Sequence, residues 1–194
     1  MNRIPLALPK AFESERLTLR CYREDDAAWY YEMSLRNRAH LARYESGNLV
    51  MSLTGLEETR KALLDLERHW TSEQCLFIGC FVKDTSEFVA QLYVGPFSVK
   101  PPDYILGYFA DVNHEGQGYV SEALRAVIRE IFERLDAHRV RIHCSATNIR
   151  SQRVAERCGF TKEGHIRQDH LDPDGSLSDT FVYGLLRNEY AALE

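Results

Sequence analysis

The sequence predicts one mixed α/β domain that spans residues 1–194. The chain has 194 residues, of which 44% are hydrophobic and 27% charged, which suits one globular domain with a sizeable core. Strand-like alternation and helix-like periodicity follow one another in the order strand, two helices, three strands, helix, strand, helix, two strands. No repeat, low-complexity tract or linker divides this series. We therefore expect about seven strands and about four helices in one unit.

The first half is expected to supply one strand, two helices and three further strands. Residues 16–23 alternate apolar and charged side chains, as a half-buried strand does. Asp25 and Asp26 then mark the start of a helix. The remaining elements are expected as helices within 27–44 and 53–70 and as strands at 75–83, 87–97 and 104–112. Turn-forming residues at 83–87 and 98–103 separate the three strands.

The second half is expected to start with an amphipathic helix within residues 113–135. Its apolar residues recur at the spacing of one buried stripe: Val120, Ala123, Leu124, Val127, Ile128, Ile131, Phe132 and Leu135. This stripe predicts that the helix packs on the sheet and that its N-terminal end is fixed in space. The later elements are a strand at 139–147, a helix at 149–159 and strands at 159–171 and 177–190 around a turn at 172–175.

Composition narrows the classes of partner and the compartment. A net charge of -5 does not favour binding to nucleic acid or to an anionic membrane. The five cysteines are odd in number and lack metal-type spacing, so we expect free buried thiols and no metal site. The N-terminal residues lack the apolar run of a signal peptide, and no apolar stretch approaches the ~20 residues of a membrane span. We therefore expect a cytoplasmic protein.

A Gly-x-Gly turn stands at the start of the amphipathic helix. The first turn of a helix carries free backbone N–H groups and the positive end of the helix dipole. Gly116 and Gly118 remove side chains where a bulky anion would approach the backbone, so a pyrophosphate is the expected ligand. The alternative is a tight strand-to-helix turn that simply needs two glycines. The pattern is neither a Walker motif nor the G-x-G-x-x-G dinucleotide fingerprint.

The residues Asn113-His114-Glu115-Gly116-Gln117-Gly118 resemble motif A of the GNAT superfamily of acetyl-CoA-dependent N-acyltransferases. That motif has the pattern Gln/Arg-x-x-Gly-x-Gly/Ala, from which Asn113 departs. The segment 145–168 resembles the RimJ/RimL branch, which acetylates the N-termini of ribosomal proteins. The matching positions are Asn148, Ser151, Gly159, Phe160, Glu163 and Gly164. The resemblance covers about residues 16–190, nearly the whole chain.

The resemblance implies a GNAT-type fold, with a mostly antiparallel sheet splayed around acetyl-CoA and helices on both faces. Residues of this chain that it assigns to the cofactor's pantetheine arm are Phe109, Ala110, Asp111 and Val112, through their backbone. It assigns the pyrophosphate to the N–H groups of Gly116, Gln117, Gly118, Tyr119 and Val120. Asn148 would hydrogen-bond the pantetheine arm, although an asparagine at this position is also typical of a helix cap or a turn.

The implied chemistry is direct attack of a neutral amine on the acetyl thioester. A backbone N–H near Asp111 or Val112 would stabilise the oxyanion. Ser151 would protonate the departing thiolate or orient the thiol, unless it only caps its helix. RimL-like relatives place a carboxylate base on the strand after Glu-Gly, and counting along that strand in this chain reaches His170, a histidine whose usual pKa near 6.5 suits a base. The alternatives are Asp169, a water chain, or a His170 that is only a surface residue of its strand. The acceptor site would be lined by Tyr44, Glu45, Tyr93 and His170.

The resemblance therefore favours an acetyl-CoA-dependent N-acetyltransferase acting on a protein N-terminal amine or a small amine. The alternative from another class is a GNAT-fold protein that binds acyl-CoA as a regulator or sensor without turnover. A third hypothesis is an unrelated nucleotide-phosphate binder that uses the Gly116–Gly118 turn. Because GNAT proteins often form dimers, a homodimer is a further expectation.

Overall fold

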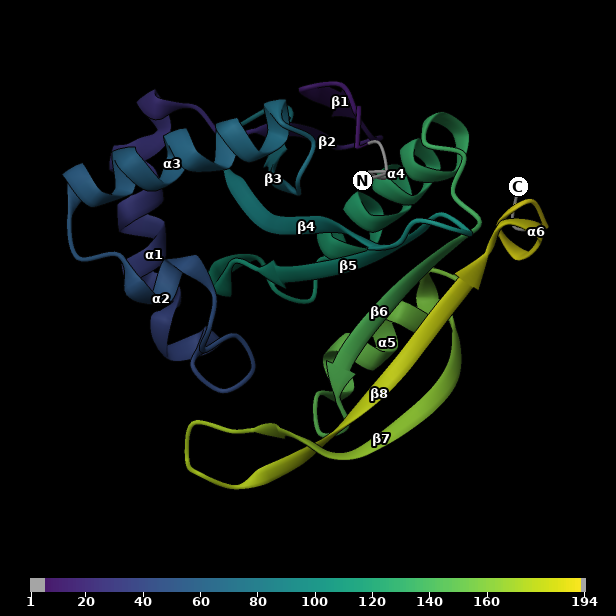
Figure 1. Cartoon of the computed structure of the whole chain (residues 1–194). Helices are drawn as coiled ribbons and strands as arrows, with labels where there is room; N and C mark the ends of the chain where they lie inside the picture. Colours follow the sequence, from purple (N-terminus) through teal and green to yellow (C-terminus); the bar gives the residue numbers. More distant parts are fainter. Residues whose placement is uncertain (1–5, 193–194) are drawn as a thin grey trace.

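The computed structural model describes residues 6–192; residues 1–5 and 193–194 of the predicted domain lie outside the described part of the chain. The central feature of the protein is an eight-stranded sheet in the order β1-β2-β3-β4-β5-β6-β8-β7 (Figure 1). The strands are β1 (Ala11–Glu13), β2 (Leu17–Cys21), β3 (Leu76–Val82), β4 (Phe88–Ser98), β5 (Asp103–Ala110), β6 (Arg139–Ser145), β7 (Thr161–Leu171) and β8 (Leu177–Leu186). All neighbours are antiparallel except β5 and β6. The predicted mixed α/β class with a mostly antiparallel sheet is confirmed.

The sheet has one strand more than the seven that the sequence predicts. The additional strand is β1, whose three residues pair with β2 from Ala11–Arg20 to Glu13–Thr18. The turn between the two strands is closed by Ser14, whose N–H donates to Leu17 O at 2.9 Å and whose Oγ accepts from Leu17 N at 3.1 Å. Three residues are too few to show an alternating pattern. This strand is therefore defined by its pairing rather than by its own sequence.

Helices cover both faces of the sheet, as expected (Figure 1). The long helices are α1 (Ala27–Leu41), α3 (Leu56–Thr71), α4 (Tyr119–Arg134) and α5 (Ile149–Arg157), and the short ones are α2 (Leu49–Ser52) and α6 (Arg187–Tyr190). The four long helices are the predicted ones, whereas the short ones carry too few residues to show a helical period. Within residues 6–192, no helix combines the length and apolar character that crossing a bilayer requires.

Two apolar clusters hold these layers together, one on each face of the sheet. The cluster under α1 and α3 is mostly aromatic and contains Tyr22, Tyr30, Phe81, Phe88 and Phe109. The other cluster contains the α4 stripe, in which every predicted residue is buried except the partly buried Val120. All five cysteines are free, and four of them are buried, as expected for structural thiols; Cys75 is partly buried.

The sheet splits between its two parallel strands. β5 pairs with β6 only from Asp103–Arg139 to Leu106–Ile142, although both strands continue for several residues. Beyond this point Gly107–Ala110 remains paired to β4 on the other side, while β6 follows β8 away from it (Figure 1). The two parted strands therefore form the walls of an opening in the middle of the sheet.

The end of β5 is fixed by one buried carboxylate, that of Asp111. Arg36 contacts it through Nε at 2.8 Å and Nη2 at 2.7 Å, and Asn37 donates from Nδ2 at 2.8 Å. The backbone N–H of Asn113 donates to the same carboxylate at 3.0 Å. Asp111 itself is fully buried. The Asp111 carboxylate thus links α1 to the segment that leads from β5 into the Gly-x-Gly turn.

These bonds keep Asp111 ionised despite its burial. Burial alone would raise the pKa of the Asp111 carboxyl, but the bonds from Asn37, Arg36 and the Asn113 amide together lower it below its usual value. A carboxyl whose pKa is lower in the folded state stabilises the fold above its unfolded pKa. That stabilisation is lost as the pH falls through the folded pKa.

Replacing Asp111 by Asn is expected to lower the free energy of unfolding at pH 7 by about 2–4 kcal/mol, because Arg36 loses a buried ionic partner. The difference from the wild type should shrink as the pH falls below about 3.9, the usual Asp pKa. Urea unfolding monitored across pH measures both effects. Asp84→Asn, at an exposed turn position, is the matched control and should change little. Equal effects of the two substitutions would contradict a central role for Asp111.

Candidate active site

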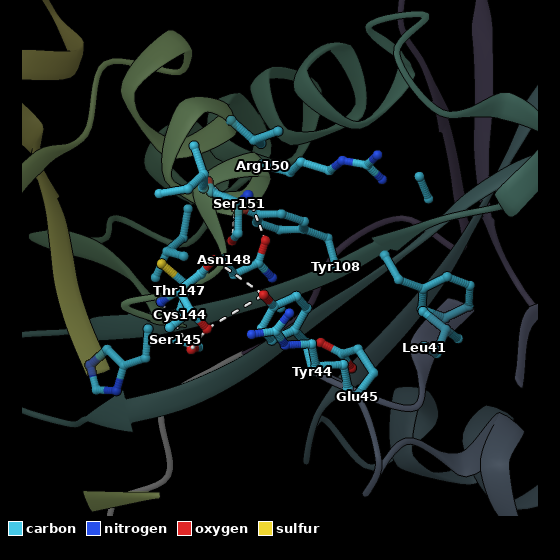
Figure 2. Close-up of a pocket in the computed structure, with 18 of the residues that line it drawn as sticks. Leu41, Tyr44, Glu45, Tyr108, Cys144, Ser145, Thr147, Asn148, Arg150 and Ser151 are labelled. Atoms are coloured by element: carbon cyan, nitrogen blue, oxygen red, sulfur yellow. Dashed lines mark hydrogen bonds between the residues drawn. The ribbon is translucent and has the colours of Figure 1, made fainter. Parts of the chain in front are cut away.

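A cavity of about 640 Å³ occupies the opening between β5 and β6. Its walls are formed by the end of α1 and the residues after it, by Leu106–Ala110 of β5, by Ile142–Ser145 of β6, by the start of α5 and by the end of β7. Figure 2 shows side chains from these segments converging on the cavity, with Tyr44 and Glu45 on the side opposite Arg150 and Ser151. A second cavity of about 750 Å³ shares Arg43, Thr147 and Asp172 with it.

The Gly-x-Gly turn lies at one end of this cavity, where its neighbours Glu115 and Val120 form part of the wall. Gly116 and Gly118 have φ angles of 74° and 81°, in the left-handed region that favours glycine, and Gly118 is the N-cap of α4. A Cβ added at Gly116 would meet nothing within 4 Å, and one at Gly118 only Arg16 at 3.7 Å. The glycines are therefore required by backbone conformation and not by close packing within the protein.

A cation that sequence reasoning missed borders the same turn. Arg16, just before β2, places Nη1 and Nη2 each 3.4 Å from Gln117 O and lies over the Tyr119 ring. Its Nε contacts Glu122 at 2.6 Å, which ties the N-terminal segment to α4. Burial alone would raise the pKa of Glu122, but bonds from Ser14 and Arg16 lower it. The turn thus presents helix N–H groups beside a guanidinium, which suits an anion.

The backbone of β5 faces the opening at two residues, of which Ala110 was predicted and Tyr108 was not. The Asp111 N–H donates to Val89 O on β4 at 2.9 Å. Because backbone groups alternate in direction along an antiparallel pair, those of Tyr108 and Ala110 point away from β4, toward the opening. Phe109 and Ala110, for which cofactor binding stays a prediction, both line the cavity. The free edge therefore consists of Tyr108 and Ala110.

The expectation for Asp111 and Val112 is wrong in one respect. Their N–H groups cannot meet an oxyanion as they stand, because that of Asp111 is bonded to Val89 O and that of Val112 donates to Asn37 Oδ1 at 2.9 Å. The Asp111 C=O also accepts from His114 N at 2.9 Å. With its carboxylate bonded as well, Asp111 is part of the scaffold and is not exposed to a cofactor.

Asn148 and Ser151 stand together at the start of α5, on the wall formed beyond β6. Asn148 is the N-cap: its Oδ1 accepts from Ser151 N at 3.1 Å. The capping interpretation of Asn148 is therefore confirmed, while its position on the cavity wall leaves a contact with pantetheine as a prediction. Ser151 is not the N-cap but the third residue of α5, so the expectation that it caps the helix is wrong.

The Ser151 side chain contacts Tyr108, a residue that the sequence analysis did not single out. The Tyr108 hydroxyl lies 2.9 Å from Ser151 Oγ and donates to Ser151 O at 3.1 Å (Figure 2). Burial raises the pKa of the Tyr108 phenol, so the hydroxyl stays protonated at neutral pH and can donate a hydrogen bond. Cys144 lies in the same wall, and burial raises the pKa of its thiol, which therefore stays protonated. The sequence signal was weak, because β5 contains a second tyrosine, Tyr104, besides Tyr108.

The structure separates the residues predicted for the acceptor side. Tyr44, Glu45 and His170 line the cavity, and the Tyr44 hydroxyl donates to Thr147 O at 3.1 Å across it. His170 is half-exposed, and its Nε2 lies 3.9 Å from Asp172 Oδ1. Tyr93 does not line either described cavity; its ring packs against Phe77 on the neighbouring strand at 5.1 Å between centroids.

The predicted alternative base, Asp169, is also absent from the wall of both cavities. Of the two adjacent candidates, only His170 faces the opening. Within residues 6–192, no group of three or more His, Cys, Asp or Glu side chains has an arrangement that could hold a metal ion.

The site thus belongs to an α/β protein whose sheet parts between two parallel strands beside a glycine turn at a helix N-terminus, a position that suits an anion. Comparison with known proteins identifies the family. The acetyltransferase (GNAT) domain matches residues 16–161, about three quarters of the chain, which therefore belongs to the GNAT acetyltransferase family.

Individual relatives agree with this assignment. The probable N-acetyltransferase YjcK of Bacillus subtilis is 41% identical over 81 residues, which cover 42% of this chain and less than half, 44%, of YjcK. The ribosomal-protein-serine acetyltransferase of Escherichia coli is 28% identical over 156 residues, 80% of this chain and 84% of the relative. The solved structure of RimL, a ribosomal-protein α-N-acetyltransferase in complex with coenzyme A, superposes with a TM-score of 0.79 at 26% identity, covering 89% of this chain and 95% of RimL.

Replacing Gly118 by Ala is expected to lower the free energy of unfolding by about 1–2 kcal/mol, the cost of a left-handed conformation for an L-residue. Thermal or urea unfolding measures it. Gly47→Ala is the control, since an added Cβ there meets nothing within 4 Å, one at Gly118 meets only Arg16 in ordinary contact at 3.7 Å, and Gly47 has no positive φ. If Gly118→Ala were as stable as Gly47→Ala, the turn would not need its left-handed geometry.

Proposed function

We propose that this protein transfers an acetyl group from acetyl-CoA to a primary amine, either the N-terminal α-amine of a protein or a small amine. The observation that carries the proposal is one cavity in which a free strand edge, at Tyr108 and Ala110, lies beside the N-terminus of α4 with its two left-handed glycines. The free strand edge suits a ligand arm that carries amide groups, and the N-terminus of α4 suits a pyrophosphate. Family membership supports the same ligand.

The residues around the opening fit acetyl-CoA along its length. Tyr108 and Ala110 would pair through their backbone with the pantetheine arm, and Asn148 would contact it from the opposite wall. The N–H groups from Gly116 to Val120 would bind the pyrophosphate, with Arg16 adding positive charge. Acetyl-CoA, when bound, supplies an activated acetyl thioester. RimL, a relative in structure, is named as a complex with coenzyme A.

Ser151 is proposed to stabilise the sulfur that leaves when the amide forms. Its hydroxyl would donate a hydrogen bond to the developing thiolate, while the Tyr108 hydroxyl, which donates to Ser151 O, holds Ser151 Oγ in place at 2.9 Å. The nitrogen loses one proton and the sulfur gains one, so both hydroxyls end the reaction unchanged. The protonated thiol of Cys144 supports direct attack over an acyl-cysteine intermediate.

His170 is proposed as the group that accepts the proton of the amine, because it is the predicted base that lines the cavity.

The relatives named for ribosomal-protein serine and alanine acetylation support a protein N-terminus as acceptor, and the one named for spermidine supports a small amine. The setting that we propose is the cytoplasm, and the proposed assembly is a homodimer, which sedimentation would test.

Calorimetric titration with acetyl-CoA tests the proposal without a choice of acceptor. Micromolar one-to-one binding that ATP does not displace is the expected result, and Gly118→Val should weaken it more than about tenfold by placing a branched side chain in the phosphate site. Displacement by ATP would favour a general nucleotide-phosphate binder. Binding without transfer to any amine would favour the acyl-CoA sensor, and no binding would reject the cofactor.

Replacing Ser151 by Ala is expected to lower turnover about 10- to 100-fold, the value of one hydrogen bond to a charged group, and to leave acetyl-CoA affinity within about threefold. Tyr108→Phe should lower turnover too, but should add little in a Ser151→Ala background because it acts through Ser151. Steady-state kinetics of the wild type, the two single variants and the double variant give the coupling energy between Tyr108 and Ser151. Ser98→Ala is the control. Fully additive effects would separate Tyr108 from the Ser151 hydroxyl.

A further inference from the structure

Glu45 occupies a fixed position on the acceptor side of the cavity. It lies in the connection between α1 and α2, where its N–H donates to Leu41 O at 2.8 Å and its C=O accepts from Asn48 N at 2.9 Å. The neighbouring Tyr44 is bonded to Thr147 across the opening. Glu45 is therefore held against the cavity by its own backbone and by the residue beside it (Figure 2).

The Glu45 carboxylate is half-buried and has no cationic partner. Among residues 6–192, the side chain that bonds it is the Asn48 amide, at 3.1 Å from Oε2, and no arginine, lysine or histidine offsets its lost hydration. Burial raises the pKa of Glu45 above its usual value, the direction expected for a carboxyl without a counter-charge. A carboxylate that is partly desolvated and has no counter-charge destabilises the folded protein, and a bound cationic ligand would offset that free-energy cost.

Arg43 also lines the cavity and lies over the Tyr44 ring, 5.0 Å from its centroid, whereas the other carboxylates of the cavity have basic side chains beside them. Glu115 is paired with Arg150 and lies 3.5 Å from His40 Nε2. Asp172 is the nearest carboxylate to His170, at 3.9 Å. Among residues 6–192, Glu45 is thus the carboxylate of this cavity that has no Arg, Lys or His side chain within ion-pair distance.

We propose that Glu45 binds the ammonium group of the acceptor and so selects a primary amine for this cavity. The proposal rests on the proposed acetyl transfer, whose acceptor is a cation at neutral pH. Glu45 lies opposite Ser151 and Asn148, so an ammonium held there enters from the side away from the α5 wall (Figure 2). The nitrogen and the thioester carbon would then approach each other across the cavity. The ligand chemistry shared by a protein N-terminus and a polyamine is the primary ammonium.

The test is calorimetric binding of three probes to the CoA-saturated protein at pH 7. The probes are a short lysine-free peptide with a free N-terminal serine, the same peptide acetylated at its N-terminus, and spermidine. The wild type is expected to bind the free peptide or spermidine at least about tenfold more tightly than the capped peptide. Glu45→Gln should lose that preference and keep its affinity for CoA, which shows that the variant is folded. Glu32→Gln, at an exposed position on α1, is the matched control and should keep the preference.

The outcomes separate Glu45 from the cofactor. Preference for the free peptide or for spermidine, lost only in Glu45→Gln, supports the proposal and identifies which source supplies the ammonium. An unchanged preference in Glu45→Gln overturns the role of Glu45, as does failure of the wild type to prefer any ammonium probe while it still binds CoA. Failure to bind CoA at all overturns the proposed function itself.

Discussion

The buried Asp111 carboxylate is the interaction on which the geometry of the cavity depends. It joins Arg36 and Asn37 of α1 to the residues that leave β5, and it does so at the point where β5 has already parted from β6. Without this link, the end of β5 and the Gly-x-Gly turn would be free to move relative to α1. Because α1 leads directly to Tyr44 and Glu45, one carboxylate fixes both the anion-binding end and the opposite wall. Because the Asp111 side chain is fully buried and cannot bond to water, its carboxylate oxygens need these protein partners.

Sequence patterns identified the elements that are long and regular. The buried stripe of α4 and the alternation of β6 depend on residues close together in the chain, so their periods are visible without the fold. The glycine turn was found for the same reason. Asp111 was assigned to the cofactor through its backbone, from the family resemblance, whereas its carboxylate is bonded to Arg36, which lies 75 residues away. The Tyr108–Ser151 contact spans 43 residues and was equally invisible.

Positions counted along a strand were predicted less well than the strand itself. β7 has register shifts between Lys162 and Gly164 and between Ile166 and His170, and each shift changes which residues face the opening. A uniform count therefore could not decide between Asp169 and His170. Tyr93 was expected among the residues that line the acceptor site, but its ring packs on Phe77 of the neighbouring strand. Side-chain direction, and not residue identity, determined both outcomes.

The bond from Tyr44 to Thr147 spans the opening at the place where the two cavities meet, since both are lined by Arg43, Thr147 and Asp172. The first cavity borders β5 and the α4 turn, and the second borders the hairpin of β7 and β8. Under the acetyl transfer proposed above, two adjoining spaces would let donor and acceptor be present together, without an exchange in which one departs first.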